Sequence, residues 1–240
     1  MLHTTRGIVL QTFSYTDSSV ITKIYTELFG LQSYLVNAAH SRRSATRAGL
    51  LQPLTLVECV VYKKEKKQLQ RIKEIKCAQP YADIPHNIAK SSIALFLNEI
   101  LCKSIREEEC DQQLYEFIHH SLLLLDLSTA SCANFHLYFM LRLSRHLGFF
   151  PSNNFSASQK YFDLQEGFFK TFEPHHALFI SPLLAEKLNV LMNSSFENIA
   201  ALPISAAERK QLLENLITYY ELHIPALRNV RSHKVLEEIF

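Results

Sequence analysis

The stretch RGIVLQTFSYTDSSVITKIYTELFGLQSYLV, residues 6–36, decides the fold. Apolar and polar residues alternate along it, and β-branched and aromatic residues are frequent, which is typical of strands. We predict strands over residues 6–15, 18–28 and 31–39. Gly30 lies between the second and third of these, and glycine adopts a positive φ without steric strain. These two strands are therefore predicted to form a hairpin.

Two further strands are predicted beyond a polar excursion at residues 40–49. Residues 54–62, LTLVECVVY, follow Pro53, which is tolerated at the start of a strand. After the charged turn KKEKK, residues 68–77 alternate apolar with charged residues. Their apolar spacing of three also fits the start of a helix, but a charged turn between two β-prone runs favours a hairpin. Five short strands interrupted after the third predict an OB-type β-barrel.

Beyond residue 80 the apolar spacing changes to about 3.6 residues, which is typical of helices. We predict helices over residues 87–105, 111–127, 132–147, 182–193, 205–223 and 232–239. Between the third and fourth, residues 151–181 contain a hairpin turn at Glu166-Gly167. The fold class is thus α+β and multidomain, with an N-terminal five-stranded OB-fold β-barrel at 1–80. An all-α helical domain with a small hairpin insertion follows at 81–240.

The two parts differ in charge, although the chain as a whole has a net charge of only +2. Residues 1–80 hold twelve Lys and Arg against five Asp and Glu, a net of +7; residues 81–240 hold thirteen against eighteen, a net of −5. A basic first part attracts polyanions, and a line of cations is what a phosphate backbone binds. Two clusters stand out, one in the polar excursion and one in KKEKK, and loops at one end of a barrel can converge. The alternative is that the charged turns only keep the protein soluble. The predicted DNA-binding residues are Lys23, Arg42, Arg43, Arg47, Lys63, Lys64, Lys66, Lys67, Arg71 and Lys73.

Other chemistry is poorly supported by the sequence. No P-loop, Rossmann, G-x-S-x-G or H-E-x-x-H pattern occurs. The five cysteines, an odd number without C-x2-C spacing, are interpreted as reduced and mostly buried thiols of a cytoplasmic protein. Adjacent histidines point in different directions, so no metal site is predicted. The four tyrosines of the β region are predicted to lie in the core or at the rim rather than to stack with bases, and no run is long and apolar enough for a membrane helix.

Arg142 and Arg145 lie beside the apolar stripe of the third predicted helix. A basic edge next to a hydrophobic groove suits an acidic peptide tail with an apolar end. The alternative is the ordinary surface of an amphipathic helix.

The quoted N-terminal stretch resembles the start of the RecO family, with a strand, a Y-[ST]-[DE]-x-S turn and a T-E-x-x-G hairpin. SRRSATRAGLLQPLTLVECVVY, residues 41–62, resembles that family's basic loop and fourth strand. LLENLITYYELHIPALRNVRSHKVLEEIF, residues 212–240, resembles its C-terminal helix and the segment after it. The resemblance therefore runs from one end of the chain to the other, with the N-terminal match the more specific.

The resemblance implies a recombination mediator that binds single- and double-stranded DNA, anneals complementary strands and helps to load RecA. It implies RecR and the C-terminal tail of single-stranded DNA-binding protein as partners, no turnover chemistry, no cofactor, and a cytoplasmic, nucleoid-associated location. Many members carry four cysteines of a zinc module, but residues 151–181 contain none. The segment is expected either to survive as a metal-free hairpin or to be built differently. Two other classes stay open: a protein-only adaptor without DNA contact, and a hydrolytic enzyme that uses buried His and Asp.

Overall fold

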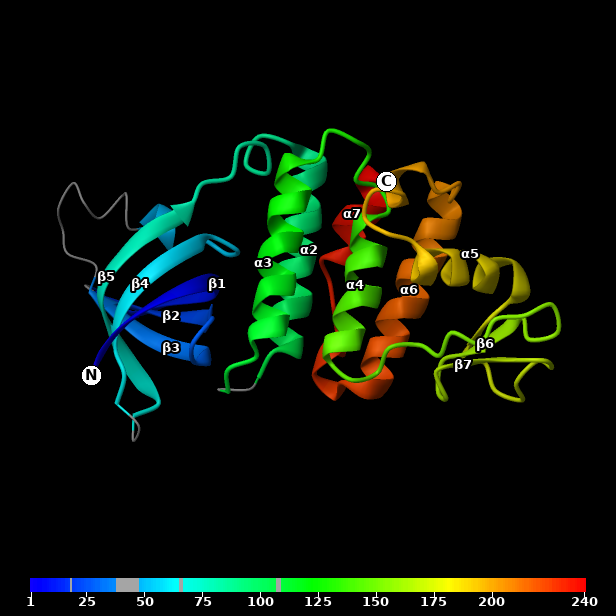
Figure 1. Cartoon of the computed structure of the whole chain (residues 1–240), viewed down its shortest axis with the longest axis horizontal. Helices are drawn as coiled ribbons and strands as arrows, with labels where there is room; N and C mark the ends of the chain where they lie inside the picture. Colours follow the sequence, from blue (N-terminus) through cyan, green and yellow to red (C-terminus); the bar gives the residue numbers. More distant parts are fainter. Residues whose placement is uncertain (18, 38–47, 65–66, 107–108) are drawn as a thin grey trace. The chain divides into compact units, whose positions relative to one another are not determined.

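A closed five-stranded barrel forms the N-terminal part of the chain (Figure 1). The computed structural model describes residues 1–17, 19–37, 48–64, 67–106 and 109–240. The strands are β1 (Leu2–Thr16), β2 (Ser19–Thr26), β3 (Gly30–Asn37), β4 (Leu56–Tyr62) and β5 (Leu69–Gln79). They are hydrogen-bonded in the order β1-β2-β3-β5-β4, and all pairs are antiparallel except β3 with β5. The predicted OB-fold barrel is confirmed, and so are the hairpin at Gly30, where φ is 61°, and the strand after KKEKK.

Strand β1 closes the barrel because it pairs with two neighbours. Gly7 stands where the two pairings meet, opposite Thr26 of β2 and Val57 of β4. A Cβ atom at this position would lie 2.5 Å from Cγ2 of Ile24, closer than real side chains approach. Because glycine has no Cβ atom, the Ile24 side chain can pack directly against the backbone of β1 at this position.

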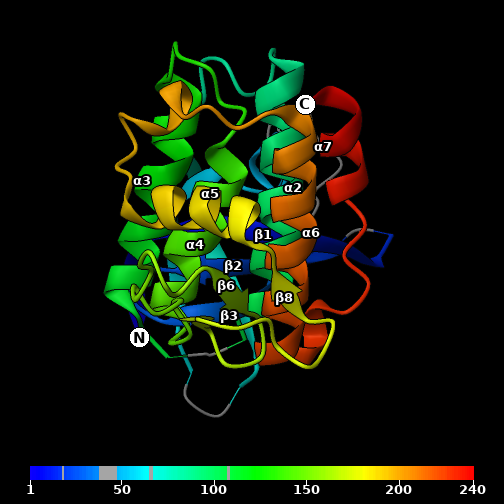
Figure 2. The ribbon, with the colours of Figure 1, turned by 90° about the vertical axis from the view of Figure 1, so that its right-hand side faces the viewer.

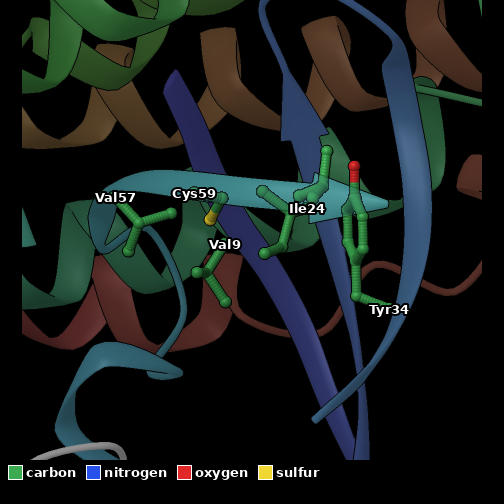
Figure 3. Packing of buried hydrophobic residues seen from close by; sticks show 6 residues of the cluster. Val9, Ile24, Tyr34, Val57 and Cys59 are labelled. Carbon is green, nitrogen blue, oxygen red and sulfur yellow. The ribbon is translucent and has the colours of Figure 1, made fainter. Parts of the chain in front are cut away.

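Side chains of all five strands fill the barrel interior, and Figure 3 shows some of those from β1 to β4. Val9, Ile24, Tyr34, Val57 and Cys59 converge there, and all five have no exposed surface. Full burial of a Val or Ile side chain contributes about 1.5–3 kcal/mol to the free energy of folding. Burial also raises the pKa of Cys59 to about 12, so this thiol acts as a packing group.

The expectation that the cysteines are mostly buried is wrong. Only Cys59 is buried; Cys77 and Cys110 are exposed, and Cys102 and Cys132 are half-buried. All five are free thiols. Cys77 and Cys110 lie at a strand end and before a helix, where periodicity gives no burial signal.

By contacts between residues, the chain divides into two compact units that are interleaved in sequence. Unit 1 comprises Met1–His86 and Asn98–Asp126; unit 2 comprises Asn87–Leu97 and Leu127–Phe240. Helix α2 (Ile88–Ser104) contributes to both units, and α3 (Gln112–Leu127) belongs almost wholly to unit 1. The boundary predicted at residue 80 stays a prediction.

Within unit 1, α3 is attached to the barrel part at both of its ends. The carboxylate of Asp126 accepts hydrogen bonds at 2.8–2.9 Å from the backbone N–H groups of residues 82, 83 and 84. At the other end, the hydroxyl of Tyr25 donates to the carbonyl of Asp111 at 3.3 Å. The Asp111 side chain also accepts from the N–H of Leu114 at 2.9 Å and so caps the N-terminus of α3.

Unit 2 consists of helices with a small sheet at one side of them (Figure 2). Helix α5 (Pro182–Asn193) lies across α4 (Phe135–His146) in this view, and α4 also packs against α6 (Ala206–His223). A capping box joins Ser205 and Glu208 at the start of α6. Among the described residues, no helix has the length and apolar character that crossing a membrane requires. The unit also contains the first part of α2, helix α7 (His233–Ile239) and the short 3-10 turns η1 (Ile199–Ala201) and η2 (Pro225–Leu227).

The insertion between α4 and α5 forms a three-stranded sheet in the order β7-β6-β8. The predicted hairpin is confirmed: β6 (Tyr161–Asp163) and β7 (Phe168–Lys170) pair across a turn in which Gly167 has a φ of 72°. Strand β8 (Phe179–Ile180) pairs with the other side of β6.

Candidate nucleic-acid interface

One transverse row of side chains crosses the outer face of four barrel strands. Tyr34 and Ile24 point into the core, so their neighbours in β3 and β2 point outward. The strand registers place Phe13 opposite Ile21, Ile21 opposite Leu35, and Leu35 beside Arg71. We call these four residues the outer row. The row thus consists of three apolar side chains followed by one cation, Arg71 on β5.

A groove continues the outer row where β3 and β5 separate. The two strands pair in parallel over only three residues each, Ser33–Leu35 and Leu69–Arg71. Beyond this pairing lies a cavity of about 230 Å³, which we call the Arg71 groove. Two of the predicted DNA-binding residues, Arg71 and Lys73, line it. The full lining is Leu35, Val36, Asn37, Arg71, Ile72, Lys73 and Ile75.

Neither cation of the groove is buried in an ion pair that would remove it from solvent. Arg71 and Lys73 are both exposed. Lys73 has a carboxylate neighbour, Glu74, at 3.6 Å, and both of these side chains are largely exposed. Exposed pairs of this kind contribute at most about 1 kcal/mol, so an incoming phosphate can displace the carboxylate.

Lys23 lies on the neighbouring row of the same face, between Gln11 and Ser33. Its ammonium group is 6.0 Å from the centroid of the Phe13 ring, in the range of a cation–π contact. Phe13 is 42% exposed. Its outward position depends on the register irregularity between Val9 and Gln11, because unbroken alternation would place Phe13 on the same face as the buried Val9.

The tyrosines of the β region follow their predicted roles in part. Tyr25 and Tyr34 are buried, whereas Tyr15 and Tyr62 are 59% and 41% exposed. Tyr15 falls at an irregularity in the β1–β2 register, between Ser14 and Thr16. An exposed aromatic ring near cations is the type of group on which unpaired bases stack.

The described part of the KKEKK hairpin lies beside the turn between β2 and β3. The ammonium group of Lys63 donates to the amide oxygen of Gln32 at 2.8 Å and lies 5.3 Å from the Phe29 ring centroid. The side chain of Gln70 braces the turn, because it accepts from the N–H of Lys64 at 3.0 Å and donates to its carbonyl at 2.9 Å. Lys64 and Lys67 are exposed. Lys63 is thus partly engaged within the barrel, and the other two are open to solvent.

Arg42, Arg43, Arg47 and Lys66 lie outside the described residues. The last described residue before the first three is Asn37, which pairs with Ser19 at the end of β3 far from Gly30. The two basic clusters are therefore attached near opposite ends of β3. Their convergence on one ligand stays a prediction.

Two other cations of the N-terminal part are engaged in ion pairs. Arg6 donates to Glu27 at 2.7 and 2.9 Å and to Glu116 of α3 at 2.6 Å. The hydrogen bond to Glu27 raises the pKa of Arg6, and the same bond lowers the pKa of Glu27. Lys76 pairs with Glu58 at 2.7 Å. These two cations act within the barrel and its attached helix.

Arg142 and Arg145 lie on α4 in unit 2. The guanidinium of Arg142 is 5.0 Å from the Tyr138 ring centroid and donates to the carbonyl of Ser194. That of Arg145, which is exposed, is 4.2 Å from the centroid of Phe150. Each therefore presents a cation against an aromatic ring, and Arg142 also holds the C-terminus of α5.

The insertion does not fit a structural zinc ion, because its polar groups are of the wrong type. Asp163, which has no exposed surface, contacts the Lys170 ammonium at 2.8 Å and His176 at 3.2 Å. Burial of Asp163 acts to raise its pKa, but Lys170 and two backbone N–H groups outweigh this and leave the pKa below its usual value. A zinc site of this kind needs thiolates or imidazoles, and here a lysine takes the central place.

One group of potential metal ligands occurs elsewhere in the described part of the chain. Ligand atoms of Glu116, His119 and His120 lie within 4.8 Å of one another on α3. However, Glu116 already accepts from Arg6 at 2.6 Å. The guanidinium of Arg6 would therefore repel a metal ion bound to the same carboxylate.

Comparison with known families accounts for almost the whole chain. Residues 1–81 match the model described as "Recombination protein O N terminal", and residues 85–232 match "Recombination protein O C terminal". The first match spans the barrel.

Individual relatives agree with these models over their full length. The chain is 38% identical over 240 residues to "DNA repair protein RecO" of Phocaeicola vulgatus, with all of both chains covered. It is 39% identical over 241 residues to the protein of that name in Bacteroides fragilis, again with complete coverage of both. A third relative of the same name, from Porphyromonas gingivalis, is 32% identical over 244 residues. The chain therefore belongs to the RecO family of DNA repair and recombination proteins.

Proposed function

We propose that this protein binds single- and double-stranded DNA through the outer face of its barrel and anneals complementary strands as a recombination mediator. The observation that carries the proposal is the outer row of Phe13, Ile21 and Leu35, which ends at the cations of the Arg71 groove. OB-folds bind oligonucleotides on the face of strands 2 and 3, which is where this row lies.

The chemistry of this face suits a nucleic acid with accessible bases. Cations along the groove attract the phosphate backbone, and binding releases counterions. Exposed rings such as Phe13 and Tyr15 provide stacking surfaces for unpaired bases, each worth about 1–3 kcal/mol. Two single strands held by cations on one protein lose much of their mutual repulsion, so pairing between them is accelerated.

A salt titration of full-length protein tests the electrostatic part. We expect the affinity for a fluorescent oligonucleotide, measured by anisotropy, to fall steeply with ionic strength. The double variant Arg71→Glu/Lys73→Glu should weaken binding regardless of base sequence. The single variant Lys73→Glu is compared with Lys76→Glu, a control on the same strand with the same change in charge, because Lys76 is already paired with Glu58. Equal losses in both variants would remove the Arg71 groove from the interface.

Stacking is tested separately with Phe13→Ala. This variant should bind single-stranded DNA less tightly while its affinity for duplex DNA changes little, since the bases of a duplex are not free to stack. A parallel loss for both substrates would assign Phe13 a packing role instead.

We further propose that the helical part contacts protein partners and that the complex with RecR helps to load RecA. The cation–aromatic pairs at Arg142 and Arg145 suit the acidic, apolar-ended tail of single-stranded DNA-binding protein. The test is binding of a labelled tail peptide to wild-type protein and to Arg145→Ala. If the peptide binds but no oligonucleotide does, the protein is an adaptor without DNA contact.

A further inference from the structure

A second cavity, of about 380 Å³, opens beside Lys23 in unit 1. Strands β1, β2 and β3 provide one wall, and the residues at and after the end of α2 provide the other. We call it the Lys23 pocket. Its lining residues are Leu10, Gln11, Lys23, Leu31, Ser33, Cys102, Ile105 and Arg106, all of them in unit 1.

The polar groups of the pocket suit an anion. Lys23 and Arg106 are cations, and the Gln11 amide and the Ser33 hydroxyl are neutral groups that can donate hydrogen bonds. None of the eight lining residues carries a carboxylate. Guanidinium and ammonium groups bind phosphate oxygens through short, charge-assisted hydrogen bonds.

The remaining lining strengthens this attraction. Leu10, Leu31 and Ile105 make part of the wall apolar, and a less polar surrounding strengthens the interaction between charges. The thiol of Cys102 donates to the carbonyl of Leu10 at 3.4 Å, and burial raises its pKa to about 11. This thiol therefore stays neutral and does not compete with an anion.

The nearby acid on α2 is already neutralised. Glu99 is paired with Lys103 at 3.3 Å, one turn further along the helix, and neither of them lines the pocket. Lys103 thus lies at the same end of α2 as the pocket, but it binds Glu99 and does not line the pocket.

We infer that the Lys23 pocket seats one phosphate group of a DNA strand whose bases lie along the outer row. This rests on the proposed DNA binding. Lys23 and Ile21 are two residues apart on β2, so the pocket and the outer row are about 7 Å apart on the same face. Arg106, which lies beyond the barrel strands, then becomes part of the DNA-binding surface.

The test compares Lys23→Ala, Arg106→Ala and the double variant in full-length protein. The double variant removes the contact with the one phosphate group, so the slope of log affinity against log salt should fall by about 0.7 for a single-stranded 20-mer, and by less in each single variant. The double variant should lose affinity by roughly tenfold at moderate salt. Arg106→Lys should retain most of the slope, and the double variant Glu99→Gln/Lys103→Ala, which removes this pair without changing the net charge, should match wild type. Thermal unfolding of each variant verifies that the fold is intact.

The outcomes separate this inference from the proposed function. If wild-type protein fails to bind any oligonucleotide, the proposed function is wrong and the inference fails with it. If wild type binds but the double variant has the wild-type affinity and slope, only the inference is overturned.

A free phosphate could use the same groups, and a second measurement distinguishes it. Inorganic phosphate is titrated into the protein while the side-chain NMR signal of Arg106 is followed. A shift of this signal with phosphate, together with unchanged DNA affinity in the double variant, would assign the pocket to a free anion and overturn the inference. A shift of the same signal with an oligonucleotide, but not with its neutral methylphosphonate analogue, supports it.

Discussion

At Arg6, one guanidinium group meets carboxylates from two different elements. It bonds to Glu27, next to β2, and to Glu116 on α3, 110 positions along the chain. Its side chain is 38% exposed, so solvent screens part of the attraction. The group therefore contributes to stability mainly by separating two carboxylates that would otherwise face each other.

We predict that Arg6→Ala lowers the free energy of unfolding by about 1–2 kcal/mol, because both carboxylates lose their partner. Urea denaturation measures it. Lys76→Ala is the control, since the Lys76 side chain is 69% exposed and its pair with Glu58 should contribute less than about 0.5 kcal/mol. Equal losses in the two variants would mean that Arg6 acts as an ordinary surface charge.

His136 is expected to make the stability of the protein depend on pH. Burial, together with the nearby charge of Arg209, lowers the pKa of His136 to about 3. Its pKa in the unfolded chain is about 6.5. Between these values the unfolded state binds a proton that the folded state does not, so stability is lost as pH falls below about 6.5. The slope is about 1.4 kcal/mol per pH unit.

His136→Phe removes this proton and should flatten the pH dependence. We expect the difference in unfolding free energy between wild type and variant to shift by about 2 kcal/mol in favour of the variant between pH 6.5 and 5. Urea midpoints across this range measure the shift. A constant difference would show that His136 is protonated in the folded protein.

At the scale of elements, Gly7 marks a place where the packing of β1 leaves no room for a side chain. Gly7→Ala should destabilise the protein by about 1–3 kcal/mol, because the added Cβ meets Ile24 at 2.5 Å. Gly49→Ala is the matched control, as nothing lies within 4 Å of its Cβ position. Thermal unfolding compares the two, and a loss of the same size at Gly49 would argue against a packing cause.

The two glycines with positive φ in unit 2 give a similar pair. In Gly148→Ala and Gly167→Ala the alanine must adopt positive φ values of 84° and 72°, which destabilises the protein by about 1–2 kcal/mol in each variant. Only at Gly167 does the new Cβ also meet the hydroxyl of Tyr219, at 2.9 Å. Gly167→Ala should therefore be the more destabilising, and adding Tyr219→Phe should recover part of the excess. No recovery in this double-variant comparison would contradict the clash.

The sequence predicted the elements better than their pairing. Alternation along β1 to β3 and the turn at Gly30 are local signals, and both were interpreted correctly. The parallel pairing of β3 with β5 joins Tyr34 to Gln70, 36 positions later, and no local pattern announces it. The same limit applies to the candidate site. Charge indicated Arg71 and Lys73, but only the register places Phe13 in the same row.

At the scale of the whole molecule, the two units do not follow the order of the sequence. Helix α3 joins the barrel in unit 1 through Glu116 and Asp126, although its residues follow part of unit 2 along the chain. An apolar spacing alone shows that α3 has a buried face, but not which neighbour covers it. The basic barrel is therefore completed by residues from the helical part.

We predict that a fragment of residues 1–126 is more stable than a fragment of residues 1–81. The shorter fragment loses the Asp126 bonds to residues 82–84, the contact of Tyr25 with Tyr115, and the partner of Arg6 on α3. Urea denaturation followed by circular dichroism compares the two. Equal stability would show that the barrel folds without α3.

The closure of the barrel has a consequence for how any ligand can bind to it. Each of the five strands is hydrogen-bonded to two others, so no strand lies at an open edge of the sheet, and a peptide could pair with backbone only over short stretches such as the one where β3 and β5 separate. What this barrel binds is therefore recognised mainly through side chains and loops. Since these vary in sequence more freely than backbone geometry does, specificity on this surface can change in evolution while the barrel itself stays the same.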